Sequence, residues 1–306
     1  MLSFLVFWFA HSFLSAPALQ HPVIEIVCSA WNYDAPKTKW DIVGYPSTGG
    51  DPVTLVAGPE SEVHPFLFPG EGAFGYFVEQ GEKVVLWKYD LATGQSSDMG
   101  ITIDRRVTCQ VSPDGKRLAC ADVIDQRYQI VVFDLATKRR EVITTHATDS
   151  FDPSWSPDGK RLVYFLRDAQ KIRVGGQLMA RRDKLAIYDF ETKTHRLLIN
   201  EPNVRDQYGR WSPDGRWIAF SREGKRAWSI WVVRPDGTEA AEVTTGARDD
   251  NFPNWSADSK TIVFQSYRSG NGDYLDIYRV DLATKVVTRV SNTGRIDEQR
   301  PLFVGR

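Results

Sequence analysis

The stretch that decides the fold runs from Pro153 to Lys160 and reads PSWSPDGK. Its second half, Ser-Pro-Asp-Gly, recurs along the 306-residue chain. The copies begin at Ser112, Ser156 and Ser212, and a degraded copy, Ser-Ala-Asp-Ser, begins at Ser256. The spacing is therefore about 44 residues, lengthened once, which is the period of a repeated supersecondary unit.

A second motif keeps step with the first. Asp-Leu-Ala-Thr begins at Asp90, Asp134 and Asp281, and Asp-Phe-Glu-Thr begins at Asp189. The remaining slot is filled by Arg234–Gly237, which reads Arg-Pro-Asp-Gly. Because two unrelated tetrapeptides share one period, the period belongs to the fold and not to composition.

Each motif has a mechanical reason to recur. Ser-Pro-Asp-Gly fits a type I turn, with Pro presetting φ at the second corner and Gly at the fourth. Strand-forming runs such as Arg161–Phe165 follow it, and Asp-Leu-Ala-Thr then closes a second hairpin. One period is therefore four short antiparallel strands, which is the pattern of a β-propeller blade.

Counting repeats predicts six blades in one all-β domain. Five blades start near residues 62, 105, 149, 205 and 249. Residues 23–58 carry three strands, and residues 297–304 carry one. We expect these four strands to form the sixth blade, so that the C-terminal strand pairs with the N-terminal segment and closes the ring. Closure would remove the exposed sheet edges that promote aggregation.

The consensus P-x-W-S-P-D-G resembles the repeat of the TolB-like (PD40) propellers, which also occurs in prolyl-oligopeptidase-type propellers. The resemblance covers about residues 23–306. It implies a periplasmic protein that binds a protein partner, because TolB works with an outer-membrane lipoprotein. TolB also carries a separate α/β domain ahead of its propeller, and this chain leaves no room for one. That departure argues against a role in the Tol system itself.

The N-terminus predicts export. Leu2–Leu19 is largely apolar and ends in Ala16-Pro17-Ala18, a small-x-small triplet that signal peptidase accepts. We therefore expect a signal peptide at residues 1–20, a single propeller domain at 21–306 and a periplasmic or secreted protein. An uncleaved anchor is the alternative, and membrane association would otherwise need a partner. The near-neutral net charge of −1 excludes a nucleic-acid binder that works by bulk electrostatics.

Three cysteines, Cys28, Cys109 and Cys120, are too few for a disulfide framework. Cys109 and Cys120 lie symmetrically about the turn at Ser112–Gly115, so they should face each other across a hairpin. Export would allow a disulfide between them. We favour two small buried thiols.

Charged residues precede the inner strands of the blades. The acids that we expect around one mouth of the central channel are Glu62, Asp149, Asp206, Asp250 and Asp297, and the third blade carries Arg105 and Arg106 instead. Converging carboxylates could hold a basic peptide or a cation such as calcium, with the arginines as an additional anchor. The structural alternative is that each acid caps backbone N–H groups between neighbouring blades.

Blade four carries an insertion at residues 166–184, with six basic and two acidic residues. It joins the second and third strands, which places it on the same face as the acids. Insertions on one face often mark a binding face, so Arg173, Arg181 and Arg182 are candidate binding residues. A tolerated surface elaboration is the alternative.

No catalytic motif is present: the chain has no HExxH, GxSxG or P-loop. We therefore expect a monomeric, non-catalytic propeller that binds a protein or peptide through its channel face, without a cofactor. The alternatives are a carbohydrate lyase or hydrolase with its site at the channel mouth, and a purely structural propeller. Trp155, Trp211 and Trp255 repeat at one inner position, where we expect them to pack between blades.

Overall fold

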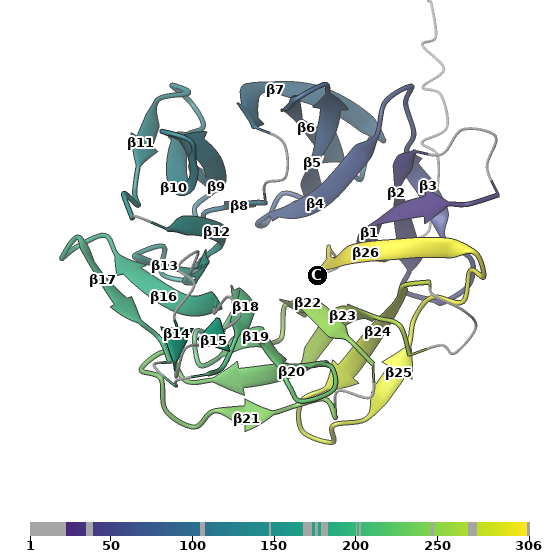
Figure 1. The fold of residues 1–306 in the computed structure, drawn as a ribbon. Coiled ribbons are helices and arrows are strands. Elements are labelled where there is room, and N and C mark those ends of the chain that lie inside the picture. Colours follow the sequence, from purple (N-terminus) through teal and green to yellow (C-terminus); the bar gives the residue numbers. More distant parts are fainter. Residues whose placement is uncertain are drawn as a thin grey trace, which may run out of the picture.

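In the computed structural model the chain forms a ring of six four-stranded antiparallel sheets around a central channel (Figure 1). The structure describes residues 23–34, 39–104, 108–146, 148–167, 173–174, 177–178, 183–199, 201, 203–245, 248–268 and 274–304. Within these ranges no helix has the length and apolar character needed to cross a membrane. The predicted all-β, six-bladed propeller is confirmed.

The blades follow one another along the chain. Blade 1 comprises β1 (Ile24–Asn32), β2 (Trp40–Pro46), β3 (Val53–Val56) and β26 (Ile296–Phe303). Blade 2 comprises β4 (Glu62–Phe68), β5 (Ala73–Gln80), β6 (Lys83–Asp90) and β7 (Gln95–Asp104). Blade 3 comprises β8 (Cys109–Val111), β9 (Arg117–Ile124), β10 (Arg127–Asp134) and β11 (Arg140–Val142).

The second half of the ring repeats the plan. Blade 4 comprises β12 (Asp149–Trp155), β13 (Arg161–Arg167), β16 (Asp183–Asp189) and β17 (Thr194–Leu197). Blade 5 comprises β18 (Asp206–Trp211), β19 (Ile218–Glu223), β20 (Trp228–Val233) and β21 (Ala241–Glu242). Blade 6 comprises β22 (Asp250–Trp255), β23 (Thr261–Ser266), β24 (Asp276–Asp281) and β25 (Val287–Arg289).

Both repeated motifs form the turns that the sequence predicts. In Ser-Pro-Asp-Gly, the Gly115 N–H donates to the Ser112 carbonyl at 2.9 Å, and Gly115 has a φ of 69°. In Asp-Leu-Ala-Thr, one carboxylate oxygen of Asp90 accepts the N–H and the hydroxyl of Thr93 at 2.7 and 2.9 Å. The local hydrogen bonds explain why these residue types recur, because each turn satisfies its own polar groups.

The ring is closed by blade 1, whose strands come from both ends of the described chain (Figure 1). Strand β26 pairs antiparallel with β1, with Ile26 opposite Phe303 and Ala30 opposite Glu298. Leu302 and Phe303 are buried, so closure adds apolar contacts as well as backbone hydrogen bonds. The predicted pairing of the C-terminal strand with the N-terminal segment is confirmed.

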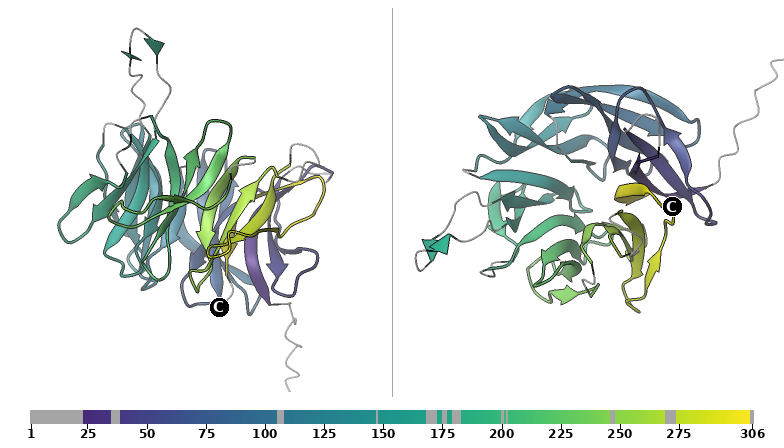
Figure 2. Two further views of the ribbon diagram at one scale, coloured as in Figure 1. Left: turned by 90° about the horizontal axis from the view of Figure 1, so that it is seen from below. Right: turned by 45° about the vertical axis from the view of Figure 1, so that its right-hand side comes forward.

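The insertion of blade 4 contains a short hairpin that projects from the ring (Figure 2). Its strands are β14 (Arg173–Val174) and β15 (Gln177–Leu178). Arg167 is the last residue of β13, and in the strand register it lies opposite Asp149 of β12 and Asp183 of β16. The insertion therefore leaves the blade at the end where the inner strand begins, as the sequence predicts.

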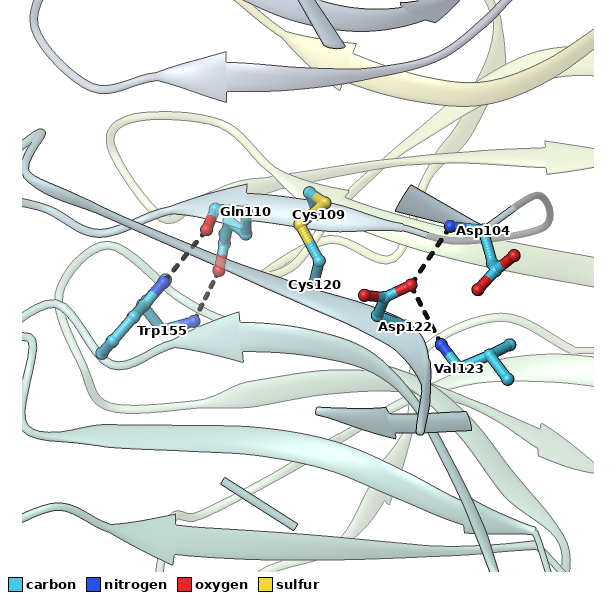
Figure 3. The surroundings of a disulfide bond; sticks show 7 residues. All are labelled: Asp104, Cys109, Gln110, Cys120, Asp122, Val123 and Trp155. Carbon is cyan, nitrogen blue, oxygen red and sulfur yellow. Dashed lines mark hydrogen bonds between the residues drawn. A yellow bond between two sulfur atoms is a disulfide. The ribbon is translucent and has the colours of Figure 1, made fainter. Parts of the chain in front are cut away.

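The repeated tryptophans pack between blades. Trp155 is buried, and its indole N–H donates to the Gln110 carbonyl of the preceding blade at 3.0 Å (Figure 3). Trp255 donates in the same way to the Arg210 carbonyl of blade 5, also at 3.0 Å. The indole N–H of Trp211 makes no such bond within the described residues, although its ring is buried against residues of blade 4. All three rings are buried at the blade junctions, which confirms the structural role that we expected.

Cys109 and Cys120 lie opposite each other on β8 and β9 and form a disulfide (Figure 3). The predicted cross-hairpin pairing is correct, whereas the favoured interpretation as two thiols is wrong. Turn geometry alone fixes the register but not the oxidation state, which depends on the redox compartment. Cys28 is buried and free, and burial raises the pKa of its thiol well above its ordinary value.

Candidate functional site

The wall of the central channel is made by the innermost strand of every blade. Strands β4, β8, β12, β18, β22 and β26 contact one another in turn around the ring. Side chains that leave these strands toward the axis are therefore brought together from distant parts of the sequence. This is where a propeller can build a site from several blades at once.

A bulge interrupts five of the six inner strands and places one residue in the left-handed region. These residues are His64, Asp152, Tyr208, Phe252 and Arg300, with φ between 51° and 59°. The strand register shifts at each of them. A residue other than glycine with this backbone conformation is strained by about 1–3 kcal/mol, and such residues cluster at functional sites. The backbone position is repeated while the side chain differs in every blade, as expected of a ligand-facing position.

Three of the bulge residues, His64, Phe252 and Arg300, line a cavity of about 40 Å³ on the channel axis. Its polar lining comes from His64, Thr108, Arg210, Asn254 and Arg300. A cavity of this size holds a few waters or one small polar group, such as a carboxylate. The site can therefore accept the tip of a ligand and not a whole metabolite.

Two arginines share a single carboxylate beside this cavity. An Nη2 atom of Arg210 lies 3.6 Å from Oδ1 of Asp152, and Nη1 of Arg300 lies 3.7 Å from the same oxygen. The three side chains, which we name the channel triad, are only 7% (Asp152), 16% (Arg210) and 21% (Arg300) exposed. The triad thus carries one excess positive charge in a largely desolvated place.

Neither arginine is saturated with hydrogen bonds in the described part of the protein. Arg210 donates to the Gly209 carbonyl at 3.0 Å and to the Asp152 carbonyl at 3.5 Å, and Arg300 stacks over the Phe252 ring at 4.4 Å. Oδ1 of Asp152 is buried without a hydrogen bond. Burial lowers the pKa of both guanidinium groups. A bound anion would relieve this desolvation, because it would accept the remaining N–H donors.

Aromatic rings fix the triad in place. Tyr208 stacks on Phe252 with ring centroids 3.8 Å apart, and burial raises the pKa of Tyr208 to about 12. The phenol is therefore neutral at physiological pH. A rigid aromatic platform next to a cation is typical of recognition surfaces.

The chemistry of the triad argues against a cation on the axis. Calcium binds six to eight oxygen ligands, whereas Asp152 lies between two guanidinium groups. In the described ranges no three His, Cys, Asp or Glu side chains come together as metal ligands. The channel next to the cavity favours an anionic group.

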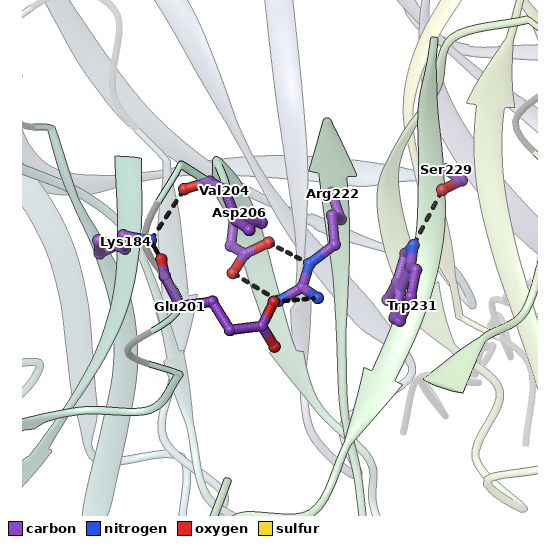
Figure 4. Close-up of polar contacts among 7 residues, drawn as sticks. All are labelled: Lys184, Glu201, Val204, Asp206, Arg222, Ser229 and Trp231. Carbon is purple, nitrogen blue, oxygen red and sulfur yellow. Dashed lines mark hydrogen bonds and ion pairs between the residues drawn. The ribbon is translucent and has the colours of Figure 1, made fainter. Parts of the chain in front are cut away.

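The acids that the sequence singled out occupy two different positions. Glu62, Asp206 and Asp250 are buried at the start of their inner strands, and each pairs with a cation of the protein. Asp206 forms a bidentate pair with Arg222, at 2.7 and 3.0 Å (Figure 4). Burial raises the pKa of Asp206, while the bonds from Arg222 act in the opposite direction.

Asp149 and Asp297 lie one strand position earlier than the buried acids. Asp149 accepts the backbone N–H of Tyr128 at 3.1 Å, and Asp297 accepts that of Leu275 at 2.8 Å. In both cases the donor begins the third-strand region of the preceding blade. These are the interblade caps that the sequence offered as the structural alternative. A binding role for these acids stays a prediction.

The basic candidates are only partly described. Arg173 lies in β14, whereas Arg105, Arg106, Arg181 and Arg182 fall outside the described residues. The segment around Arg105 is flanked by Asp104, whose N–H donates to Asp122 at 3.1 Å (Figure 3).

Sequence reasoning missed the channel triad. Its members come from three blades, and no spacing within one repeat reveals them. A signal was present for two of its members: Asp152 and Arg300, like Phe252, lie directly before a proline and three residues before the repeated aromatic, whereas Arg210 lies directly before Trp211. Comparing this column across blades would have shown one fixed position with changing side chains.

The fold and the channel define a six-bladed β-propeller of four-stranded blades. No family model matches the chain. An uncharacterized protein of Agrobacterium fabrum, Atu1656, is 28% identical over 247 residues, 79% of this chain and 78% of that protein. The Tol-Pal system protein TolB of Anaeromyxobacter dehalogenans is 29% identical over 128 residues, which is 42% of this chain but only 26% of TolB.

Among solved structures, TolB of Acinetobacter baumannii has a TM-score of 0.76 at 18% identity, covering 92% of this chain and 67% of that one. Similar folds also include an enzyme, oligogalacturonate lyase in complex with manganese, with a TM-score of 0.56 at 15% identity over 89% of this chain and 74% of that one. The sequence and fold comparisons agree with the repeat motif: the chain is similar to the propeller of TolB.

Proposed function

We propose that the protein is an exported, non-catalytic propeller that binds a protein or peptide through its channel face. The observation that carries this proposal is the channel triad, with its surplus guanidinium donors beside a 40 Å³ cavity. A carboxylate on the partner, from a chain end or an acidic side chain, would enter the cavity and complete these bonds. The TolB relatives support a protein as the partner.

The predicted mouth residues would form the rim of this binding face. Arg105 and Arg106 would add cationic contacts around the entering segment, and the insertion with Arg173, Arg181 and Arg182 would extend the surface on the same side. Rim charges mainly accelerate association, whereas buried charges determine the lifetime of a complex. The triad and the rim should therefore affect binding differently.

The test is a pull-down from the periplasmic fraction of the source organism, followed by affinity measurement with each recovered partner. We expect Arg300→Met to raise the dissociation constant at least tenfold and to speed dissociation, while Arg105→Ala and Arg106→Ala slow association. Arg279→Ala, on the outer part of blade 6 and 46% exposed, is the matched control. Binding that is unchanged in Arg300→Met would remove the triad from the proposal.

The same preparation tests the enzymatic alternative. Incubation with oligogalacturonate and with other glycans would show cleavage products if the channel housed a lyase or hydrolase. Turnover that Arg300→Met abolishes would replace the binding proposal by a catalytic one.

A further inference from the structure

A second charged site lies at the opposite end of the ring from the insertion. A groove of about 350 Å³ between blades 4 and 5 is lined by Arg161, Arg196, Arg216, Arg234, Pro235 and Asp236. Arg161 is the first residue of β13 and follows the Ser-Pro-Asp-Gly turn. Arg167, next to the insertion, is the last residue of the same strand and lies opposite Asp149 in the register, so the groove and the insertion are at opposite ends of β13. We name this site the arginine groove, and it is separate from the channel.

The strand registers show that the arginines are specific to this groove. Arg196 is paired with Ile187 in blade 4. The same position is held in blades 3, 5 and 6 by Glu141, Ala241 and Thr288. Arg234 starts the turn that begins with aspartate in blades 3, 4 and 6, namely at Asp134, Asp189 and Asp281.

The neighbouring groove between blades 3 and 4 therefore offers a natural comparison. Its equivalent residues are Arg117, Glu141, Lys160 and Asp189, two cations and two anions. The arginine groove has four cations at the same positions, and the single acid in its lining is Asp236. Since the repeated fold does not require this charge, it points to a ligand.

Three of the four guanidinium groups are held in place before any ligand arrives. Arg234 lies over the Trp217 ring at 3.9 Å and Arg161 over the Trp211 ring at 5.4 Å. Arg196 donates to the Pro235 carbonyl across the groove. Stacking fixes the plane of a guanidinium while leaving its edge free to donate.

Much of the positive charge is uncompensated. Arg161 and Arg234 have exposed acidic neighbours, Asp158 at 3.5 Å and Glu239 at 3.1 Å, and exposed pairs of this kind are weak. Arg196 and Arg216 are exposed, and no carboxylate of the described residues lies within 4.0 Å of either guanidinium.

We propose that the arginine groove binds a phosphate monoester. A phosphate presents three terminal oxygens and almost two negative charges at one point, and the arginine fork matches pairs of these oxygens. Four guanidinium groups around 350 Å³ fit one compact dianion with its attached group, a volume within the range of small-molecule sites. An acidic peptide fits less well, because carboxylates on one face of an extended chain are about 6.6 Å apart.

The phosphate could belong to a soluble sugar phosphate or to a phospholipid headgroup. Calorimetry at constant ionic strength would use glucose 6-phosphate and inorganic phosphate as probes. Co-sedimentation would use vesicles with and without phosphatidic acid. Binding of the soluble probes assigns the first source, and binding of the vesicles alone assigns the second; either result supports a phosphate site.

Two variants test the residues. Arg216→Ala removes an uncompensated cation, and Arg196→Glu installs the residue type that blade 3 carries at this position. We expect each to raise the dissociation constant for the phosphate probe at least tenfold. Lys260→Ala is the matched control, because Lys260 follows the equivalent turn of blade 6 and is 77% exposed; it should change binding less than twofold.

Thermal unfolding without ligand verifies that the variants fold, since all three positions lie on the surface. Phosphate should raise the unfolding temperature of the wild type and of Lys260→Ala but not of Arg196→Glu. The proposal is overturned if Arg216→Ala and Lys260→Ala lose binding equally, if no phosphate probe binds, or if triglutamate binds more tightly than glucose 6-phosphate.

Discussion

The residue that follows each Asp-x-x-Thr turn has a left-handed backbone conformation, which shows where local strain is tolerated. Gly94 follows the first of these turns with a φ of 68°, and Lys138, Lys193 and Lys285 occupy the same place with φ between 54° and 61°. Glycine adopts this conformation without steric cost, whereas lysine does not. The repeat thus keeps the backbone geometry even where the residue does not favour it.

Replacing one of these lysines by glycine should stabilise the protein. For Lys138→Gly we expect an increase of about 0.5–1 kcal/mol in the free energy of unfolding, because relief at positive φ exceeds the entropy that glycine adds to the unfolded chain. Urea unfolding measures the change. Lys116→Gly, an exposed lysine without positive φ, should instead lower the stability, and a stabilising effect there would contradict the explanation.

The channel triad should respond asymmetrically to the loss of its members. Asp152→Asn leaves two largely buried arginines without a carboxylate, so we expect a loss of about 2–4 kcal/mol in unfolding free energy. Arg300→Met leaves Asp152 paired with Arg210 and should cost less. Chemical denaturation of both variants checks the order; equal losses would mean that the charges do not interact as the geometry implies.

At the scale of elements, a chain of polar side chains joins blade 4 to the segment that leads into it. The Tyr164 hydroxyl lies 3.0 Å from Nε2 of His146, which follows β11, and 2.8 Å from Nδ1 of His195 in β17. Neutral rings satisfy this arrangement, because the hydroxyl can donate to one nitrogen while it accepts from the other. Burial lowers the pKa of both histidines, and the charge of His146 lowers that of His195 further.

The sign of the pH dependence follows from these lowered pKa values. The unfolded chain binds protons to histidine near pH 6.5, whereas the folded protein binds them only at lower pH. Unfolding is therefore favoured by acid: stability is complete above about pH 7 and falls as the pH drops through 6.5 toward the folded pKa values. Urea unfolding between pH 5 and pH 8 should show this slope, and the double variant His146→Gln, His195→Gln should flatten it.

At the scale of the whole molecule, the ring depends on one strand at its end. Removing the last ten residues deletes most of β26, which buries Leu302 and Phe303 against the neighbouring blades. The lost burial is worth about 3–6 kcal/mol, so the melting temperature should fall by about 5–10 °C. Removing residues 1–20 is the control and should leave it unchanged. A truncated protein that melts with the full-length one would refute closure by β26.

The sequence predicts the architecture well because the information is local and repeated. Ser112–Gly115 and Asp90–Thr93 contain the donors and acceptors of their own turns, so their period counts the blades. The channel triad is different, since Asp152, Arg210 and Arg300 meet only when three blades are placed around one axis. Their proximity is a property of the closed ring and cannot be read from any single repeat.

The acidic residues predicted at the channel mouth illustrate a second limit of prediction from sequence. The prediction allows the acid to lie three or four residues ahead of the Pro-x-Trp position, so it groups Asp149 with Glu62. In the strand register Glu62 shares the buried position of Asp206 and Asp250, whereas Asp149 lies one residue earlier. One residue of register moves a side chain to the other face of a strand. The cation partners lie elsewhere in the blade, Arg222 on β19 and Arg268 just after β23. Only the observed pairing therefore shows that these carboxylates are neutralised inside the protein.

Blade 1, which combines strands from both ends of the described chain, also determines the order in which the parts of the protein can fold. Ile26 pairs with Phe303, which lies 277 residues further along the chain, so blade 1 can be completed only after the other five blades have been synthesised. Blades 2 to 6 consist of neighbouring strands and can form as they emerge, because closing short loops has a small entropic cost. The open arc leaves strand edges unpaired until the end. Pairing with β26 therefore also covers the β1 edge, which could otherwise pair with a strand of another chain.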